Sequence, residues 1–302
     1  MAPEVPRIDP QQRKPDISSS WQLRGETLDL RSGALMGVIN VTPDSFSDGG
    51  VHAAAADAIA GGIAMHDAGA EIIDVGGEST RPGAQPVSIA DELSRVIPVV
   101  ERLVDLGLLV SIDTSKPTVA RDAIAAGAGI LNDVTACSAP GMAELVVEAG
   151  VGVVLMHMQG TPEDMQQDPR YDDVVSVVAG FLAERAAHLI DMGASPDSIA
   201  IDPGIGFGKT VRHNLELLAG LGTLAHLGYP VVLGASRKSF LGRVTGIESP
   251  IDRDGVTAVT TALGFERGAR VFRVHDVSSS RAALLVAATI VTPELWEEWS
   301  PD

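Results

Sequence analysis

The stretch of sequence that indicates the fold reads Gly69-Ala70-Glu71-Ile72-Ile73-Asp74-Val75-Gly76-Gly77. A helix-like segment ends at Gly69, where the left-handed backbone just past a helix would make a Cβ clash. The run of Ile and Val that follows does not alternate with polar residues, which is typical of a strand covered on both faces. The stretch therefore predicts one helix–strand unit of a parallel sheet.

The same unit returns along the chain, with helix-like segments that end at glycines and apolar runs that follow them. The other glycines are Gly107, Gly127, Gly150, Gly193, Gly228 and Gly268. The predicted strands are Ala34–Ile39, Ile72–Val75, Leu108–Ile112, Ile130–Leu131, Val151–Met156, Ile199–Ile201, Val231–Leu233 and Val271–Val274. Strands and helices that alternate over about 260 residues favour an α/β fold, a single (β/α)8 TIM barrel. A doubly wound open sheet is the alternative.

The two ends of the chain differ from this repeating body. We expect residues 1–20, rich in proline and polar residues, to form a flexible N-terminal tail. Trp21 to Gly33 alternates apolar and polar residues and predicts a short hairpin in front of the barrel. The barrel then extends over residues 21–290, and 291–302 form a C-terminal tail, in which Trp296 and Trp299 either cap the body or contact a partner.

Composition narrows the class of protein. The chain has 302 residues and a mass of 31.4 kDa, with 45% hydrophobic and 21% charged residues, a balance that excludes disorder of the whole chain. Its 22 Lys and Arg against 40 Asp and Glu give a net charge of −18, which opposes binding to nucleic acid. The single Cys137 excludes an intrachain disulfide and a multi-cysteine metal site. Without a visible secretory signal or a long apolar run, we expect a soluble, cytoplasmic protein that binds no membrane.

Polar residues stand where each predicted strand ends. They are Asn40, Asp74, Asp113, Asn132 with Asp133, His157, Asp202, Ser236-Arg237-Lys238, and Arg273 with His275. The carboxyl ends of barrel strands meet at one rim, where the sites of such folds lie. Asp74 or Asp133 could instead cap a helix.

The segment Asp202 to Thr210 ends in Gly-Lys-Thr, as a phosphate-binding P-loop does. However, Pro203 stands where that motif needs its first glycine, and proline has no N–H for a phosphate. The loop therefore does not predict a nucleotide site. It leaves Asp202 at a strand end, where a carboxylate can accept two N–H bonds from a flat, guanidine-like heterocycle.

Arg273 and His275 lie two residues apart on the last strand, so both side chains point the same way. Such a pair at a barrel rim predicts a grip on phosphate or diphosphate, although Arg273 could instead pair with a rim acid. Asn40 lies on the strand that would close the barrel beside it. A neutral oxygen beside a diphosphate is a candidate ligand for Mg²⁺.

Two loops after strands, residues 41–50 and 76–84, combine glycines with charged and aromatic side chains and are interpreted as lids over the rim. His157 has no second ligand at metal spacing and is interpreted as a rim or core histidine. Cys137 has no base beside it and is expected to be inert.

Several motifs together resemble those of the dihydropteroate synthase family of pterin-binding TIM barrels, in the same order and over roughly Trp21 to Ala288. They are Met36–Gly50, Asp74–Ala84, Ser111-Ile112-Asp113-Thr114, Asn132-Asp133, Met156–Gly160, Asp202–Lys209, Gly234–Ser239 and Arg273–Val277. The sequence departs from the family in two loops. Asp164 stands where a small or hydroxylated residue is expected, and Ala136 or Cys137 where glycine is expected.

The resemblance implies an enzyme that joins 4-aminobenzoate to 6-hydroxymethyl-7,8-dihydropterin diphosphate and releases diphosphate in folate synthesis. It implies that the pterin is bound by Asp113, Asn132, Asp202 and Lys238. Mg²⁺ and diphosphate would be held by Asn40, Arg273 and His275, and the aminobenzoate by Phe46, Thr80, Pro82, Phe207 and Ser239. Of these, Asp113, Lys238, Arg273 and His275 would take part in catalysis, Asp113 as an ionised carboxylate beside the electron-poor pterin.

The resemblance also implies a homodimer, which the apolar late helices Ala258–Leu263 and Ala282–Ala288 favour, and a target of sulfonamides whose sensitivity the sequence does not report. Two alternatives for function stay open. One is a pterin-binding methyltransferase domain, which would not need the Arg273 and His275 grip. The other is a non-catalytic paralogue, which should have lost residues of the lids or rim.

Overall fold

Eight parallel strands close into a barrel in the computed structural model, which describes residues 18–41, 50–79, 83, 85–161 and 164–299. The strands are β3 (Ala34–Asn40), β4 (Ile72–Gly76), β5 (Val110–Asp113), β6 (Ile130–Asp133), β7 (Gly152–Met156), β8 (Ile199–Asp202), β9 (Val231–Leu233) and β10 (Ala269–Val274). They follow one another around the barrel in chain order, and β10 pairs with both β9 and β3. The predicted (β/α)8 barrel is therefore confirmed, and the open sheet is wrong.

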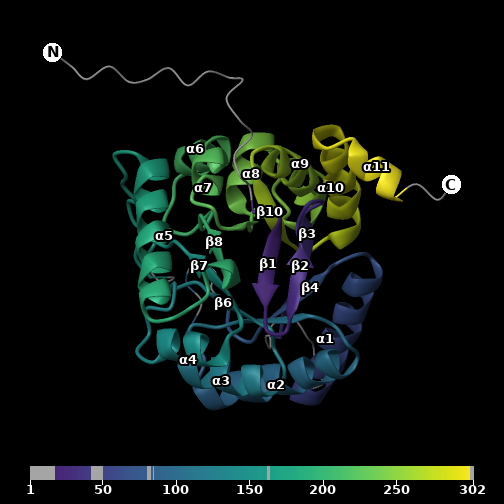
Figure 1. Cartoon of the computed structure of the whole chain (residues 1–302), viewed down its shortest axis with the longest axis vertical. Helices are drawn as coiled ribbons and strands as arrows, with labels where there is room; N and C mark the ends of the chain where they lie inside the picture. The colour runs from purple at the N-terminus through teal and green to yellow at the C-terminus, as the bar shows by residue number, and fades with distance from the viewer. Residues whose placement is uncertain (1–17, 42–49, 80–82, 84, 162–163, 300–302) are drawn as a thin grey trace.

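Helices surround these strands in Figure 1. They are α1 (Gly50–Asp67), α2 (Ile89–Asp105), α3 (Pro117–Ala125), α4 (Met142–Ala149), α5 (Val174–Asp191), α6 (Val211–Ala219), α7 (Leu221–Ala225), α8 (Ser239–Thr245), α9 (Asp254–Glu266), α10 (Val277–Val291) and α11 (Glu294–Trp299), with short 3₁₀ turns at Pro196–Ser198 and Ile251–Arg253. The glycines that the sequence places after helices, from Gly69 to Gly268, all have positive φ. They end the helices as predicted.

A hairpin of β1 (Ser20–Leu23) and β2 (Glu26–Asp29) covers the end of the barrel at which the strands begin, as the alternation after Trp21 predicts. Trp21 is fully buried, and its indole N–H donates to the Ser198 carbonyl at 2.9 Å. It packs with Leu23 and Leu30 against inward residues of the strands, namely Ala34, Met36, Ile72, Ile130, Val154, Ala200, Val232 and Val271. The hairpin thus fills the base of the barrel, and the opposite rim is left for a site.

The C-terminal segment contains a short helix. In α11 only Leu295 is buried, at 4% exposure, whereas Trp296 is 60% exposed. Glu298 pairs with Arg31, which lies in the turn between β2 and β3, at 3.2 Å. The segment therefore attaches to the body through Leu295, while Trp296 and Trp299 stay exposed, and their contact with a partner stays a prediction. Most of the predicted N-terminal tail, residues 1–17, lies outside the described residues.

None of the helices in the described ranges combines the length and the apolar character that a membrane crossing requires.

The burial of Trp21 gives a test of the hairpin's role. We expect Trp21→Ala to lower the free energy of unfolding by about 3–5 kcal/mol, because it opens a cavity under the barrel and removes the hydrogen bond to Ser198. Urea unfolding followed by circular dichroism measures the change. Trp296→Ala is the matched control, since this exposed ring should cost less than about 1 kcal/mol. Equal losses in the two variants would contradict a structural role for the hairpin.

Candidate active site

Arg273 lies at the centre of the polar rim. From β10 its Nε donates to Oδ2 of Asp74 at 2.6 Å, and its Nη2 donates to Oδ2 of Asp113 at 2.6 Å. Burial lowers the pKa of the guanidinium, but the charges of Asp74 and Asp113 outweigh that effect and raise it. In this structure Arg273 thus pairs with acids of the rim, which is the alternative that the sequence analysis gave for it.

Asp74 is a member of this cluster that the sequence analysis left as a possible helix cap. Its side chain is fully buried, and the Oδ2 that binds Arg273 also accepts a hydrogen bond from Nδ2 of Asn132 at 3.1 Å. A signal was present in the sequence, because an acid inside the continuous run Ile72 to Val75 must find a partner when both strand faces are covered. Asp74 therefore connects Asn132 and Arg273 through one carboxylate oxygen.

Three side chains converge on the bare backbone of Gly234. A Cβ built on this glycine would lie 3.7 Å from Oδ2 of Asp202, 3.9 Å from Nζ of Lys238 and 3.9 Å from Cβ of Arg273. The other oxygen of Asp202, Oδ1, accepts the N–H of Gly204 at 2.7 Å. The strand ends of β8, β9 and β10 thus bring together residues that are far apart in the sequence.

Lys238 and Asp202 influence each other's charge. Burial lowers the pKa of Lys238 to about 8, and the charge of Asp202 opposes that shift. Burial likewise raises the pKa of Asp202, with Lys238 opposing. The Lys238 ammonium also donates to the Ile205 carbonyl and lies 4.7 Å from the centre of the Phe207 ring. The loop after β8 therefore sets the surroundings of Lys238.

Asp113 is a rim carboxyl whose pKa is shifted toward neutrality. Burial raises its pKa to about 7; Arg273 opposes the shift, and the charge of Asp74 adds to it. Its side chain keeps 10% exposure, in contrast to the fully buried Asp74. A ligand at the rim can therefore reach Asp113 directly.

His275 and Asn40 stand at the ends of two paired strands, β10 and β3. Nδ1 of His275 lies 2.9 Å from Oγ of Ser236, which also accepts the His275 backbone N–H at 3.2 Å. Ser239 is exposed at the first position of α8. The remaining predicted aminobenzoate residues, Phe46, Thr80 and Pro82, lie outside the described residues, as does most of the first predicted lid.

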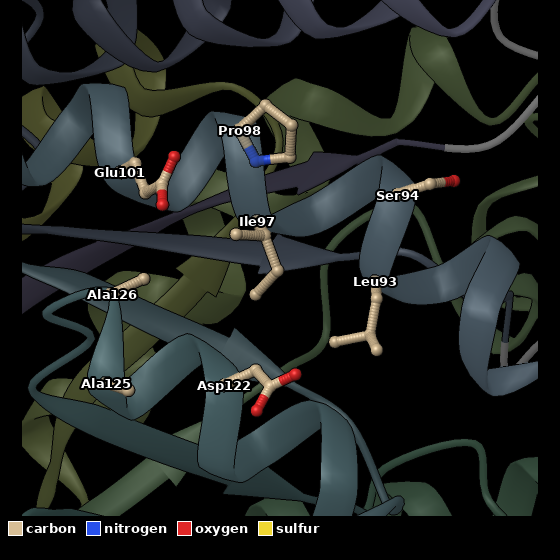
Figure 2. Close-up of a pocket in the computed structure, with 8 residues that line it drawn as sticks. All are labelled: Leu93, Ser94, Ile97, Pro98, Glu101, Asp122, Ala125 and Ala126. Atoms are coloured by element: carbon tan, nitrogen blue, oxygen red, sulfur yellow. The ribbon is translucent and has the colours of Figure 1, made fainter.

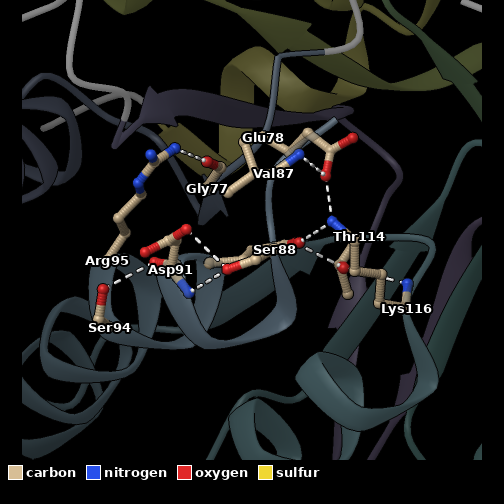
Figure 3. Close-up of polar contacts among 10 residues, drawn as sticks. Gly77, Glu78, Val87, Ser88, Asp91, Ser94, Arg95, Thr114 and Lys116 are labelled. Atoms are coloured by element: carbon tan, nitrogen blue, oxygen red, sulfur yellow. Dashed lines mark hydrogen bonds and ion pairs between the residues drawn. The ribbon is translucent and has the colours of Figure 1, made fainter. Parts of the chain in front are cut away.

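The second predicted lid is anchored at its root, as Figure 3 shows. Lys116, three residues after Asp113, pairs with Glu78 and with Glu92 of α2, a carboxylate that is 1% exposed. Glu92 also accepts the Thr114 hydroxyl at 2.7 Å. These contacts join the start of the loop to the strand end that carries Asp113, beside a cavity of about 140 Å³ that these residues and Met158 help to line.

A larger hollow lies away from the rim. It measures about 590 Å³ and runs between α2 and α3 on the outside of the barrel, where Figure 2 shows Leu93, Ile97 and Asp122 around it. Its lining has two acids and no cation, so the groups that converge at the rim have no counterpart there. We therefore assign the candidate active site to the rim.

Asp133 has a structural role in the turn after β6, but it caps no helix, because α4 begins at Met142 with Gly141 as its N-cap. Its carboxylate accepts the backbone N–H of Thr135 at 2.8 Å and of Cys137 at 2.9 Å. Ala136 and Cys137, where the family pattern leads us to expect glycine, do adopt left-handed φ values of 52° and 56°. Arg185 donates to the carbonyls of both residues, at 2.9 and 3.0 Å. These bonds hold a conformation that glycine would adopt without strain.

The other departure and the lone thiol also find local explanations. Asp164 accepts the N–H and the hydroxyl of Thr161 at 2.6 and 2.8 Å, so it caps its own turn. Burial raises the pKa of the Cys137 thiol, which fits its expected inertness. Within the described ranges, no three His, Cys, Asp or Glu side chains gather as metal ligands.

Comparison with known proteins points to one family. Residues 36–275 match the pterin binding enzyme family. The dihydropteroate synthase of Escherichia coli strain K12 is 44% identical over 273 residues, which are 90% of this chain and 96% of that protein. The Mycobacterium leprae enzyme of the same name is 48% identical over 259 residues, covering 83% and 91%.

Two solved structures extend the comparison. Dihydropteroate synthase of Xanthomonas albilineans with 4-aminobenzoic acid has a TM-score of 0.86 at 46% identity and covers 91% of this chain and 99% of that one. The same enzyme in complex with 7,8-dihydropteroate has a TM-score of 0.82 at 43% identity and covers 90% and 99%.

Proposed function

Because this chain belongs to the pterin binding enzyme family, we infer that it is a dihydropteroate synthase, a transferase that condenses 6-hydroxymethyl-7,8-dihydropterin diphosphate with 4-aminobenzoate. The observation that carries this inference is the convergence of Asp113, Asn132, Asp202, Lys238 and Arg273 at one barrel rim. That rim supplies acceptors for a flat heterocycle and cations for a leaving diphosphate.

Recognition of the pterin is assigned to Asn132, Asp202 and Lys238. The Asp202 carboxylate accepts N–H bonds from the guanidine-like edge of the ring, and the amide of Asn132 offers both a donor and an acceptor. The Lys238 ammonium donates to an acceptor of the ring. Lys238 is half-buried near the buried Asp202, and the charge of each opposes the pKa shift that burial causes in the other.

Release of diphosphate is assigned to Arg273 and His275. The amine nitrogen of 4-aminobenzoate attacks the methylene carbon of the pterin, the carbon–oxygen bond to diphosphate breaks, and the amine loses one proton. Two of the five guanidinium donors of Arg273 contact Asp74 and Asp113, so three are left for phosphate oxygens. Arg273 can thus bind the leaving group without giving up its carboxylates.

Asp113 is assigned to the positive charge that develops on the pterin as diphosphate leaves. An ionised carboxylate at the partly exposed rim stabilises that charge more than the neutral substrate. The aminobenzoate is assigned to a pocket of Phe207 and Ser239, with Phe46, Thr80 and Pro82 added on the family resemblance. An aromatic amine is nucleophilic enough to need no strong base, so positioning supplies much of the remaining rate.

Mg²⁺ is proposed as the metal, held by Asn40 and the diphosphate. A single neutral amide oxygen, with no three His, Cys, Asp or Glu side chains placed as metal ligands among the described residues, fits an ion that keeps several waters and takes its other ligands from substrate phosphates. Bound there, Mg²⁺ would neutralise charge on the departing diphosphate.

The first test is release of diphosphate on mixing the protein with pterin diphosphate, Mg²⁺ and 4-aminobenzoate. We expect release that depends on aminobenzoate and falls roughly 10²–10³-fold in Asp113→Ala and Arg273→Ala, because each removes a group that stabilises developing charge. A matched control is Asp57→Ala, an exposed acid on the outer helix α1. A well-folded wild-type protein that releases no diphosphate would favour the pterin-binding methyltransferase or the non-catalytic paralogue.

The acid limb of the pH profile tests the role of Asp113. Below its pKa of about 7 the carboxyl is protonated and neutral, so kcat/KM for pterin diphosphate should rise as the pH increases through that value. Asp113→Asn should keep a low and flat profile across the same range. An acid limb unchanged in Asp113→Asn would assign the titration to another group.

The raised pKa of Asp113 also affects stability. Its contribution to the free energy of unfolding is fully present below pH 3.8 and is lost as the pH rises through about 7.

Metal dependence tests Asn40. Removal of divalent ions with EDTA should abolish diphosphate release, and Asn40→Ala should raise the Mg²⁺ concentration for half-maximal rate by roughly tenfold, because one direct ligand is lost. Saturating Mg²⁺ should restore most of the rate in that variant. Full activity in EDTA would contradict the metal assignment.

A homodimer is proposed through the outer face of α9 and α10, which pack side by side. Val259, Leu263, Val286 and Ile290 expose apolar surface there, with Ile290 at 74%. We expect sedimentation at about twice the chain mass of 31.4 kDa, and a shift to the monomer in Val286→Glu. A wild-type monomer at micromolar concentration would contradict the dimer. The cytoplasmic location stays a prediction that cell fractionation can check.

A further inference from the structure

Lys209 belongs to the Gly-Lys-Thr segment that the nucleotide argument set aside, and the proposed chemistry does not use it. Its side chain is buried, and the residue is 3% exposed at the end of the loop between β8 and α6. Nζ lies 3.0 Å from Nδ1 of His157, 3.3 Å from the His157 carbonyl and 3.0 Å from the Phe207 carbonyl. Burial lowers the pKa of Lys209 to about 7, and the charge of Asp202 opposes that shift. In its ammonium form, Nζ has an acceptor inside the protein for each of its three donors.

His157 is built to accept this bond. Burial, and then the charge of Lys209, lower the pKa of His157 to about 3, so the ring is neutral at neutral pH. The tautomer with its proton on Nε2 leaves a lone pair on Nδ1 that can accept from Nζ of Lys209. The ring meets Phe181 edge-on, with centroids 5.0 Å apart, and lies 6.0 Å from Tyr171. Its orientation is therefore set by packing as well as by the ammonium. His157 is buried, in line with the rim or core histidine expected from the sequence, and the Lys209 amine lies beside it.

The loop after β8 rests directly on the loop after β7. A Cβ on Gly204 would lie 1.9 Å from the His157 carbonyl oxygen, and one on Gly208 would lie 2.4 Å from that of Gln159. Both glycines have positive φ, so the close approach and the turn require the same residue type. The Tyr171 hydroxyl adds a bond to the Gly208 carbonyl at 2.9 Å. Within this contact Lys209 supplies the charged link between the two loops.

The docked loop carries groups that face the proposed active site. Phe207 lies beside the Lys238 ammonium, and the carbonyl of Ile205 accepts from that ammonium. A Cβ on Gly206 would lie 3.1 Å from Cδ of Lys238, so the loop backbone also borders the aliphatic part of this side chain. A shift of the loop would therefore move the Phe207 ring and the Lys238 side chain together.

We propose that Lys209 is a positioning residue: its ammonium ties the loop of residues 203–208 to His157 and so holds Phe207 and Lys238 where they meet the pterin and the aminobenzoate. This inference rests on the proposed synthase function. It assigns Lys209 no contact with substrate. The observation that carries it is a buried ammonium with three internal acceptors, two of them on His157 and one on Phe207 itself.

The test compares Lys209→Met and Lys209→Arg with the wild type. Met keeps the length of the side chain without donors, and Arg keeps the charge with a different donor geometry. We expect Lys209→Met to fold, to raise KM for 4-aminobenzoate and to lower kcat/KM by roughly 10²-fold, because a displacement of about 1 Å near the reacting groups is that costly. Lys209→Arg should recover part of this loss.

Arg270→Met is the matched control. Arg270 is another buried cation that donates to backbone carbonyls, those of Phe265 and Ala269, but it lies where β10 begins, at the base of the barrel. The Arg270→Met variant should be less stable than the wild type but should have the same KM for 4-aminobenzoate. A change in KM of similar size in both variants, or none in a folded Lys209→Met, would overturn the proposal. If Lys209→Met does not fold, Lys209→Gln is assayed by the same criteria.

A spectroscopic measurement is independent of turnover. The imidazole resonances of His157, followed by NMR against pH, should show a pKa that rises in Lys209→Met, because the neighbouring positive charge is gone. An unchanged His157 titration would show that the two side chains are not in contact. The two proposals can also be told apart. If the wild type has no synthase activity but the His157 pKa still rises in Lys209→Met, the proposed function is refuted and the contact between the two loops is supported.

Discussion

Closure of the sheet is the constraint on which the rest of the structure depends. When β10 pairs with β9 on one side and β3 on the other, no barrel strand keeps an unpaired edge. The same pairing carries Arg273 over the rim, where it meets Asp74 of β4 and Asp113 of β5. A buried guanidinium without these carboxylates would be costly, so barrel closure and the charge balance of the site support each other.

The two ends of the barrel have different roles: the base contributes to stability, and the rim carries the groups proposed for chemistry. At the base, Trp21 and its neighbours fill the interior with apolar side chains from the hairpin and from alternate strands. At the rim, the cations Arg273 and Lys238 stand among the carboxylates of Asp74, Asp113 and Asp202. At the rim, burial moves the pKa of Asp113 up to about 7 and that of Lys238 down to about 8, since it acts on charged side chains there.

Anchoring of the rim loops follows one pattern in two places. Lys116 joins the root of the loop after β4 to Glu92, and Lys209 joins the loop after β8 to His157. In each case an ammonium links a loop to a side chain of another element. Short local sequence could not show these links, because Lys209 and His157 are 52 residues apart. The Gly-Lys-Thr segment itself resembles the end of a phosphate-binding P-loop, an interpretation that Pro203 excludes.

Periodicity and strand-end chemistry were enough to predict the eight strands, the hairpin at Trp21 and the rim positions of Asp113, Asn132, Asp202, Lys238 and Arg273, because each depends on local backbone preference and on the parallel order of the strands. The sequence could not show that Asp74 is a partner of Arg273 and Asn132 rather than a helix cap. It could not show either that Ala136 and Cys137 keep a left-handed backbone through Asp133 and Arg185. These features were decided by the tertiary structure, since the partner of a buried charge or of a strained turn is whichever group the closed barrel brings within hydrogen-bonding distance.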